Sequence, residues 1–278
     1  FASDMPLTAM EAGADMAAVS MHKTGGSLTQ SSLLLMKRGR VRPDYVRTVI
    51  NLTQTTSASY LLMSSLDIAR KALATEGKET FSRVVSLAEY ARGEINKIGG
   101  YYAFSREIID GKYICGFDTT KLSVNTLKIG LAGVEVYDLL RDDYGIQIEF
   151  GDMGNMLAII SVGDNHYAIE RLVASLSEIK RLRGREGLHL LDHEYIPPVV
   201  RMTPQEAFYA PSRPLPIRET VGKISAEFVM CYPPGIPILA PGEEVTREAL
   251  DYILYAKKKG SLVMGPQDME LNDLYIVK

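Results

Sequence analysis

A long amphipathic pattern constrains this chain more than any other feature of its sequence. From about Ser59 to Ile98, apolar residues recur every three or four positions, which is the period of one face of an α-helix. These positions are Leu62, Leu66, Ala69, Leu73, Val84, Leu87 and Ala91. The pattern predicts a long helix that other elements cover along one side, and Gly77 is expected to kink or divide it.

Shorter periodic segments flank this helix and predict a mixed α/β chain. Upstream, the sequence predicts a short helix at 6–13, a buried strand at 16–20 and a second strand at 31–36. Downstream, it predicts a layer of strands with helices on one face, at 121–124, 134–143, 146–150, 156–162 and 167–183. Beyond that layer it predicts a helix near 204–208, a strand at 223–230 and a helix at 246–259 that Thr246 caps.

Breaks in composition divide the chain into three expected domains. The chain has 278 residues, of which 46% are hydrophobic, and this is sufficient for several cores. The charged stretch 184–198 ends in paired prolines, which cannot continue a helix or a central strand, so we place a linker there. We therefore expect domains at 1–110, 111–185 and 186–278.

Charge and cysteine content exclude several classes of protein. Lys and Arg number 31 against 34 Asp and Glu without a long block of one sign, so nucleic-acid binding is not expected. Cys115 and Cys231 lie far apart and form no Cys-x-x-Cys pair, which argues for a reducing, cytoplasmic setting. No apolar run approaches the roughly 20 residues of a membrane span. The chain begins with Phe1 and enters a structural pattern at once, so we expect it to be a segment of a longer protein.

The segment 20–32, Ser-Met-His-Lys-Thr-Gly-Gly-Ser-Leu-Thr-Gln-Ser-Ser, is the densest concentration of reactive and small residues. Lys23 follows an apolar strand, where partial loss of hydration makes a neutral amine available to attack an aldehyde. Hydroxyls such as that of Ser20 and the imidazole of His22 can donate to a phosphate, and two glycines allow close backbone approach. Spacing alone leaves open the alternative that Lys23 is a surface lysine in a flexible loop.

The same segment resembles the lysine motif of the bacterial arginine/lysine/ornithine decarboxylases, which are aspartate-aminotransferase-like, fold type I enzymes. Further blocks in the same order are similar to this family. They are Thr55-Thr56-Ser57-Ala58-Ser59-Tyr60, Ser64-Ser65-Leu66-Asp67-Ile68-Ala69-Arg70, Met202-Thr203-Pro204-Gln205-Glu206-Ala207-Phe208-Tyr209, and Ala226-Glu227-Phe228-Val229-Met230-Cys231-Tyr232-Pro233-Pro234-Gly235-Ile236-Pro237 followed by Pro241-Gly242-Glu243. The likeness is greatest to the short, biosynthetic arginine decarboxylases.

This resemblance implies a fold and a site. The fold is an α/β, fold type I large domain followed by a small α+β domain and a carboxyl-terminal α+β domain. Lys23 would carry pyridoxal 5'-phosphate as a Schiff base, with Ser20 and His22 beside the phosphate. Thr56 and Ser57 would reach the phosphate of the neighbouring subunit, so the enzyme would be at least a homodimer with a shared active site.

The resemblance also implies the reaction, which is decarboxylation of a basic amino acid, with arginine giving agmatine, a polyamine precursor. Lysine and ornithine remain alternative substrates. Glu227 and Tyr232 match a segment near the substrate entrance, where the Glu227 carboxylate would hold the cationic tail; otherwise Glu227 is a solvated residue on a strand face. Lys23 or His22 would return the proton to the α-carbon.

One expected element is missing from the chain. The family uses an Asp-x-x-His stretch before the lysine, whose aspartate pairs with the cofactor's pyridine nitrogen, and the acidic residues upstream of Lys23 do not lie in that context. They are Asp4, Glu11 and Asp15. We therefore expect the upstream half of the enzyme to supply this aspartate and the isolated chain to be inactive.

Other interpretations of the sequence remain. His189 and His193 have the spacing of metal ligands on a helix but lie in the expected linker without a third ligand cluster, so we expect no metal. A fold type I transaminase is one rival function. The other is a non-catalytic fragment that forms oligomers or regulates a partner.

Overall fold

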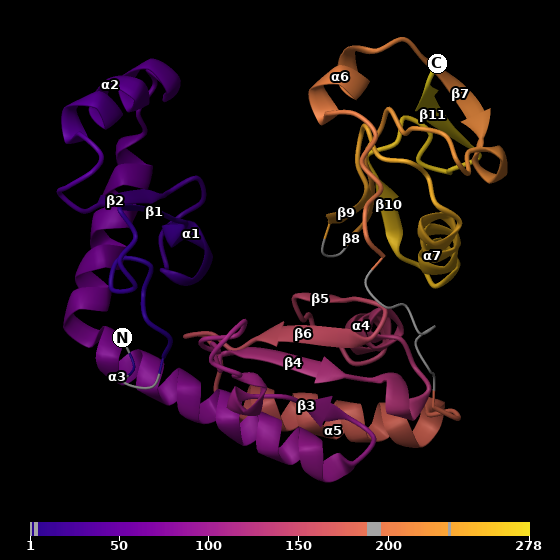
Figure 1. Cartoon of the computed structure of the whole chain (residues 1–278). Coiled ribbons are helices and arrows are strands. Elements are labelled where there is room, and N and C mark those ends of the chain that lie inside the picture. Colours follow the sequence, from indigo (N-terminus) through magenta and orange to yellow (C-terminus); the bar gives the residue numbers. More distant parts are fainter. Residues whose placement is uncertain (1, 3–4, 188–195, 233–234) are drawn as a thin grey trace. The chain divides into compact units, whose positions relative to one another are not determined.

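The computed structural model describes residue 2 and residues 5–187, 196–232 and 235–278. The chain forms two compact units, which are described separately (Figure 1). The first comprises Phe1–Arg92, Phe104–Leu122 and Ile160–Ile169, and the second Gly93–Ala103, Ser123–Ile159 and Glu170–Lys278. The three expected domain boundaries stay a prediction.

The long amphipathic pattern forms one helix, α3 (Tyr60–Ile98), of 39 residues. It continues through Gly77, so the expected division there is wrong. A single glycine lowers helix stability by only about 1 kcal/mol, and buried residues continue along α3 from Ala69 to Ile95. None of the helices in the described ranges combines the length and apolar character needed to cross a bilayer.

Before α3, an antiparallel strand pair frames a short helix. Strands β1 (Met16–Val19) and β2 (Leu33–Met36) pair with Met16 opposite Met36, and α1 (Met21–Thr24) lies between them. The strand at 16–20 was expected to be buried, yet β1 is only partly buried and its Ala18 is exposed. In β2, Leu34 and Leu35 are each 40% exposed.

Two further features of this part differ from expectation. The predicted helix at 6–13 forms only turns, with Ala12 N donating to Thr8 O at 2.9 Å. A helix that was not predicted, α2 (Pro43–Thr53), begins with Pro43 in its first turn, where a missing N–H does no harm.

A four-stranded sheet follows α3 in the order β3-β4-β6-β5. Its strands are β3 (Tyr102–Ala103), β4 (Lys121–Asn125), β5 (Phe150–Gly151) and β6 (Asn155–Ile159). The helices α4 (Gly133–Asp142) and α5 (His166–Arg183) lie where they were predicted. The strand predicted at 146–150 is confirmed only at its end, because Ile146 N donates instead to Leu140 O of α4.

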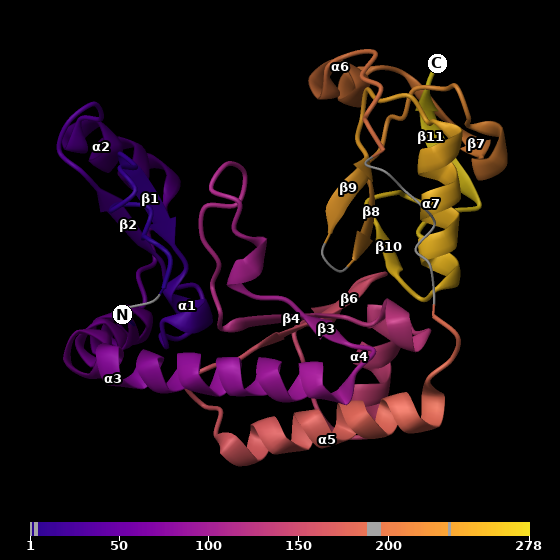
Figure 2. The same cartoon turned by 60° about the horizontal axis from the view of Figure 1, so that its bottom comes forward.

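Close backbone contacts fix the helices of the second unit. A Cβ added at Gly133 would lie 1.8 Å from Asn155 O, so only glycine allows the start of α4 to approach β6 this closely. Tyr101 Oη donates to Leu176 O at 2.9 Å, and Lys180 Nζ donates to Ile98 O at 2.8 Å. These bonds hold the end of α3 and α5 side by side (Figure 2).

The carboxyl-terminal segment of the second unit contains two small sheets and two helices. The sheets are β10-β8-β9 and β11-β7. The elements are α6 (Pro204–Tyr209), β7 (Ser212–Pro216), β8 (Val229–Tyr232), β9 (Ile236–Leu239), α7 (Arg247–Lys258), β10 (Leu262–Met264) and β11 (Asp273–Val277). The structure also contains three short 3-10 helices along the chain, η1 (Arg106–Ile108), η2 (Leu127–Ile129) and η3 (Ile217–Glu219).

The carboxyl-terminal predictions are confirmed for the helices and only partly for the strand. Thr246 Oγ1 accepts from Ala249 N at 3.1 Å, so Thr246 caps α7 as expected. The strand predicted at 223–230 begins only at Val229. Ahead of it the backbone makes isolated bridges, Ile224 with Glu244 and Ser225 with Ile276, in place of a continuous ladder.

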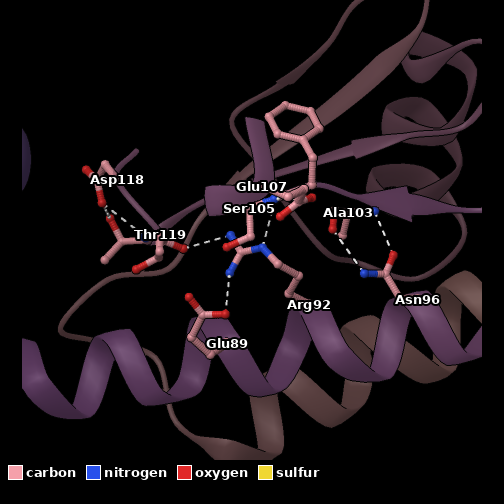
Figure 3. A network of polar contacts seen from close by, with 10 residues as sticks. Glu89, Arg92, Asn96, Ala103, Ser105, Glu107, Asp118 and Thr119 are labelled. Atoms are coloured by element: carbon pink, nitrogen blue, oxygen red, sulfur yellow. Dashed lines mark hydrogen bonds and ion pairs between the residues drawn. The ribbon is translucent and has the colours of Figure 1, made fainter. Parts of the chain in front are cut away.

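Arg92 of α3 organises the first unit from a position where it is only 4% exposed (Figure 3). Its Nε donates to Phe104 O and its Nη2 to Thr119 O, both at 2.9 Å. Its Nη1 lies 3.2 Å from Glu89 Oε2, and its guanidinium lies over the Phe117 ring. A buried cation is tolerated only with such partners, so Arg92 fixes the segment that follows β3 against α3.

We expect Arg92→Ala to lower the free energy of unfolding by about 3 kcal/mol, because the change leaves one buried and one partly buried carbonyl group unpaired. Urea denaturation measures this difference. Arg83→Ala is the matched control, since Arg83 also donates to two carbonyl groups, of Val162 and Asp164, but is exposed. The control should lose about 1 kcal/mol or less. Equal losses in the two variants would contradict the role assigned to burial.

The two cysteines should differ in reactivity because burial raises the pKa of Cys231 to about 11. At pH 8 only about one thiol in a thousand is then ionised, and the thiolate is the form that reacts. Cys115 is exposed. We expect iodoacetamide at pH 8 to modify Cys115 before Cys231, as followed by peptide mass spectrometry. Prior modification of Cys231 would contradict this.

Candidate functional site

Lys23 lies in a short connection between two paired strands. Strand β1 leads into α1, which contains His22 and Lys23, and a loop then returns to β2. The side chains of Ser20 and Lys23 are exposed, and that of His22 is half-buried. Ser20, His22 and Lys23 therefore lie together after β1 because they are neighbours in the sequence, but the described chain does not bury the Lys23 amine.

The His22 ring is held by one backbone carbonyl group. Ser31 O accepts from His22 N at 3.2 Å and lies 2.8 Å from His22 Nδ1. Because a carbonyl oxygen can only accept, Nδ1 carries the proton, and Nε2 of the neutral ring remains an acceptor. The Ser31 carbonyl group thus occupies Nδ1 and leaves Nε2 as the ring nitrogen available to a ligand.

The loop after Lys23 contains a tight backbone approach and an unpaired hydroxyl. A Cβ on Gly25 would lie 2.8 Å from Met21 O, so glycine is required for α1 to close. Ser27 Oγ is buried and has no hydrogen-bond partner among the described residues. A buried hydroxyl in this state is a ready donor for a ligand that approaches the loop.

Ser65 lies in one of the blocks that resemble the family, and its sequence position alone assigns it no role. Ser65 Oγ accepts from Leu28 N at 3.2 Å and donates to Leu62 O at 2.8 Å, so it joins the Lys23 loop to α3. The sequence carried no distinct signal for this bond, because Leu66, next to Ser65, continues the apolar period between Leu62 and Ala69.

Thr56 and Ser57 lie in the irregular segment before α3 and are exposed. Ser57 N donates to Thr55 Oγ1 at 3.1 Å. In the described ranges no hydrogen bond joins either side chain to the Lys23 segment, so their expected role in a neighbouring subunit's site stays a prediction.

Glu227 belongs to the other unit and is 8% exposed. Its Oε1 accepts from Gln267 N at 2.8 Å and its Oε2 from Tyr275 N at 2.9 Å. The alternative of a solvated residue on a strand face is therefore wrong. The carboxylate ties β11 and the segment after β10 together, a role that sequence reasoning missed because the partners are backbone groups distant in the chain.

Tyr232 ends β8 and is 50% exposed, opposite Leu262 of β10. Its ring packs against Gly235, where an added Cβ would lie 3.2 Å from Tyr232 Cδ2. The role of Tyr232 at a substrate entrance stays a prediction.

A search for a metal-binding site covers only the described residues. The described residues contain no group of three or more His, Cys, Asp or Glu side chains placed to hold a metal ion. His189 and His193 lie outside the described residues.

Comparison with solved structures places this fold among the bacterial lysine decarboxylases. The lysine decarboxylase of Francisella novicida superposes on 95% of the chain with a TM-score of 0.76 at 20% identity, and the match covers 49% of that protein. The constitutive lysine decarboxylase of Escherichia coli gives a TM-score of 0.72 at 20% identity with the same coverage.

Sequence comparison defines the family. Residues 1–168 match the major domain of the Orn/Lys/Arg decarboxylases, and residues 191–266 match their C-terminal domain. The chain is 43% identical over its whole length to the arginine decarboxylases of Bacillus subtilis and Halalkalibacterium halodurans. It therefore belongs to the Orn/Lys/Arg decarboxylase family, and it spans 57% of the length of these two relatives.

We expect Glu227→Gln to lower the free energy of unfolding by about 1–2 kcal/mol, because the new amide places an N–H group against a buried backbone donor. Urea denaturation measures the change. Glu219→Gln is the control, since Glu219 is exposed in the same unit. An unchanged denaturation midpoint in Glu227→Gln would contradict the structural role of this carboxylate.

Proposed function

We propose that this chain is the carboxyl-terminal part of a pyridoxal-phosphate-dependent decarboxylase that converts arginine to agmatine and carbon dioxide. The observation that carries the proposal is 43% identity, over the whole chain, to the arginine decarboxylase of Bacillus subtilis. The more distant lysine decarboxylases, such as the constitutive enzyme of Escherichia coli at 24% identity, make lysine the second substrate to test. The first unit would be part of a fold type I large domain.

The residues around Lys23 fit pyridoxal 5'-phosphate as cofactor. Lys23 offers an exposed amine for the cofactor's aldehyde, and Ser20 and His22 lie beside it with groups that can donate to a phosphate. The buried hydroxyl of Ser27 in the same loop, which has no partner in the described part of the chain, supports a ligand there. When bound, the cofactor accepts the electrons released as the α-carboxylate leaves.

Within this site, Lys23 would hold the cofactor before substrate arrives and then, released as a protonated amine, give that proton to the α-carbon and be left as the neutral amine. His22 is the alternative donor. Its Nδ1 is 2.8 Å from Ser31 O, so Nε2 is the atom that can carry a second proton and transfer it. The Asp that pairs with the pyridine nitrogen would come from the part of the relatives that this chain does not span.

The proposal also assigns residues to the neighbouring subunit's cofactor and to the cationic tail of the substrate. Thr56 and Ser57 would bind the phosphate of a neighbouring subunit in a cytoplasmic homodimer or higher oligomer, and agmatine would enter polyamine biosynthesis. Glu227 and Tyr232 are proposed at the substrate entrance. Each oxygen of the Glu227 carboxylate accepts one backbone N–H, so a guanidinium would bind through the remaining lone pairs.

The test measures carbon dioxide release from arginine, lysine and ornithine by the complete enzyme, in which this chain is joined to the segment that supplies the remaining length of its relatives. We expect arginine to be preferred and Lys23→Ala to lower kcat at least about 1000-fold, because the cofactor loses its attachment and the reaction its proton donor. Lys37→Ala is the control, since Lys37 is also exposed and follows β2. It should keep its activity.

Two outcomes would overturn the proposal. Full activity in Lys23→Ala would remove Lys23 from the chemistry. No release of carbon dioxide from any of the three amino acids would favour the non-catalytic alternative, an oligomer-forming or regulatory fragment.

A further inference from the structure

The loop that follows Lys23 has few internal restraints. Ser27 N donates to Met21 O at 3.4 Å, and Ser31 Oγ donates to Thr29 O at 3.3 Å, which are both long contacts. Gly26 and Gln30 adopt positive φ angles of 88° and 57°, so the loop contains no repeating hydrogen-bonded structure. Such a loop depends on contacts with a neighbouring element to hold one position.

Ser65 provides that contact. Among the described residues, the bond from Leu28 N to Ser65 Oγ is the hydrogen bond that links residues 24–30 to a helix outside the strand pair. The Ser65 hydroxyl in turn donates to Leu62 O at 2.8 Å, so its oxygen is oriented to accept. The connection therefore runs from the loop backbone, through one half-buried hydroxyl, to the backbone of α3.

We infer that Ser65 is a positioning residue for Lys23. By holding Leu28, five residues after Lys23, it restrains the loop through which α1 is joined to β2. The inference rests on the proposed function, since it gives Ser65 a role in presenting the Lys23 amine and the loop to the cofactor. Ser65 does not touch the reacting atoms; it acts through the loop.

Geometry distinguishes Ser65 from its neighbour Ser64. Ser64 is exposed and its hydroxyl makes no hydrogen bond to the described residues, whereas Ser65 is half-buried on the side of α3 that faces the loop. The two serines are adjacent in one helix, so removing either hydroxyl has nearly the same effect on helix propensity. Any difference between the two alanine variants therefore reports the bond to Leu28.

The experiment uses the complete enzyme and two readouts. In the cofactor-free protein, we expect Ser65→Ala to increase hydrogen exchange of the Leu28 amide about three- to tenfold, the range that one neutral hydrogen bond gives. In a titration with pyridoxal 5'-phosphate, followed by absorbance, we expect the Kd to rise by a similar factor. Ser65→Thr keeps the hydroxyl and should restore both values, and Ser64→Ala should match the wild type.

The outcomes separate this inference from the proposed function. If the wild-type protein binds no cofactor through Lys23, the proposed function fails, and with it the positioning role. If the wild type binds cofactor and Ser65→Ala matches Ser64→Ala in both readouts, Ser65 does not position the loop. Faster exchange without a change in Kd would also overturn the inference, because the bond would then exist without acting on the lysine.

Discussion

The structure of the first unit depends on the burial of one guanidinium group. Arg92 is 4% exposed, and its charge is tolerated because two backbone carbonyl groups and Glu89 surround it. The carbonyl groups belong to Phe104 and Thr119, so a long irregular segment is fixed to α3 by hydrogen bonds in place of a regular ladder. Arg92 thereby attaches this segment to a helix of 39 residues.

The amino-terminal end of α3 contacts the candidate site. Ser65 lies near the start of α3 and joins it to the loop after Lys23, and the exposed Thr56 and Ser57 precede the helix. The apolar strands β1 and β2 beside Lys23 are only half-buried. Burial of the Lys23 amine, which its chemistry favours, would therefore have to come from groups outside the described chain, in agreement with a proposed site shared between segments and subunits.

Sequence reasoning succeeded where the signal is local. The helices α3, α4, α5 and α7 follow their apolar period, and Thr246 caps α7 because its hydroxyl meets an amide three residues ahead. Prediction from the sequence failed where the structure depends on partners distant in the chain. Strand β7 contains two prolines and exists because it pairs with β11, about sixty residues later. Of the site, the grouping of Ser20, His22 and Lys23 was predictable from adjacency, whereas the Ser65 bond and the backbone partners of Glu227 were not.

The central claim is that Lys23 is the attachment point of the cofactor in a decarboxylase of which this chain is one part. The most direct measurement is borohydride reduction of the complete enzyme with pyridoxal 5'-phosphate, followed by mass spectrometry of the peptide that contains residues 20–32. The account predicts that the reduced cofactor is found on Lys23. A modification found on another lysine, or on none, would contradict it.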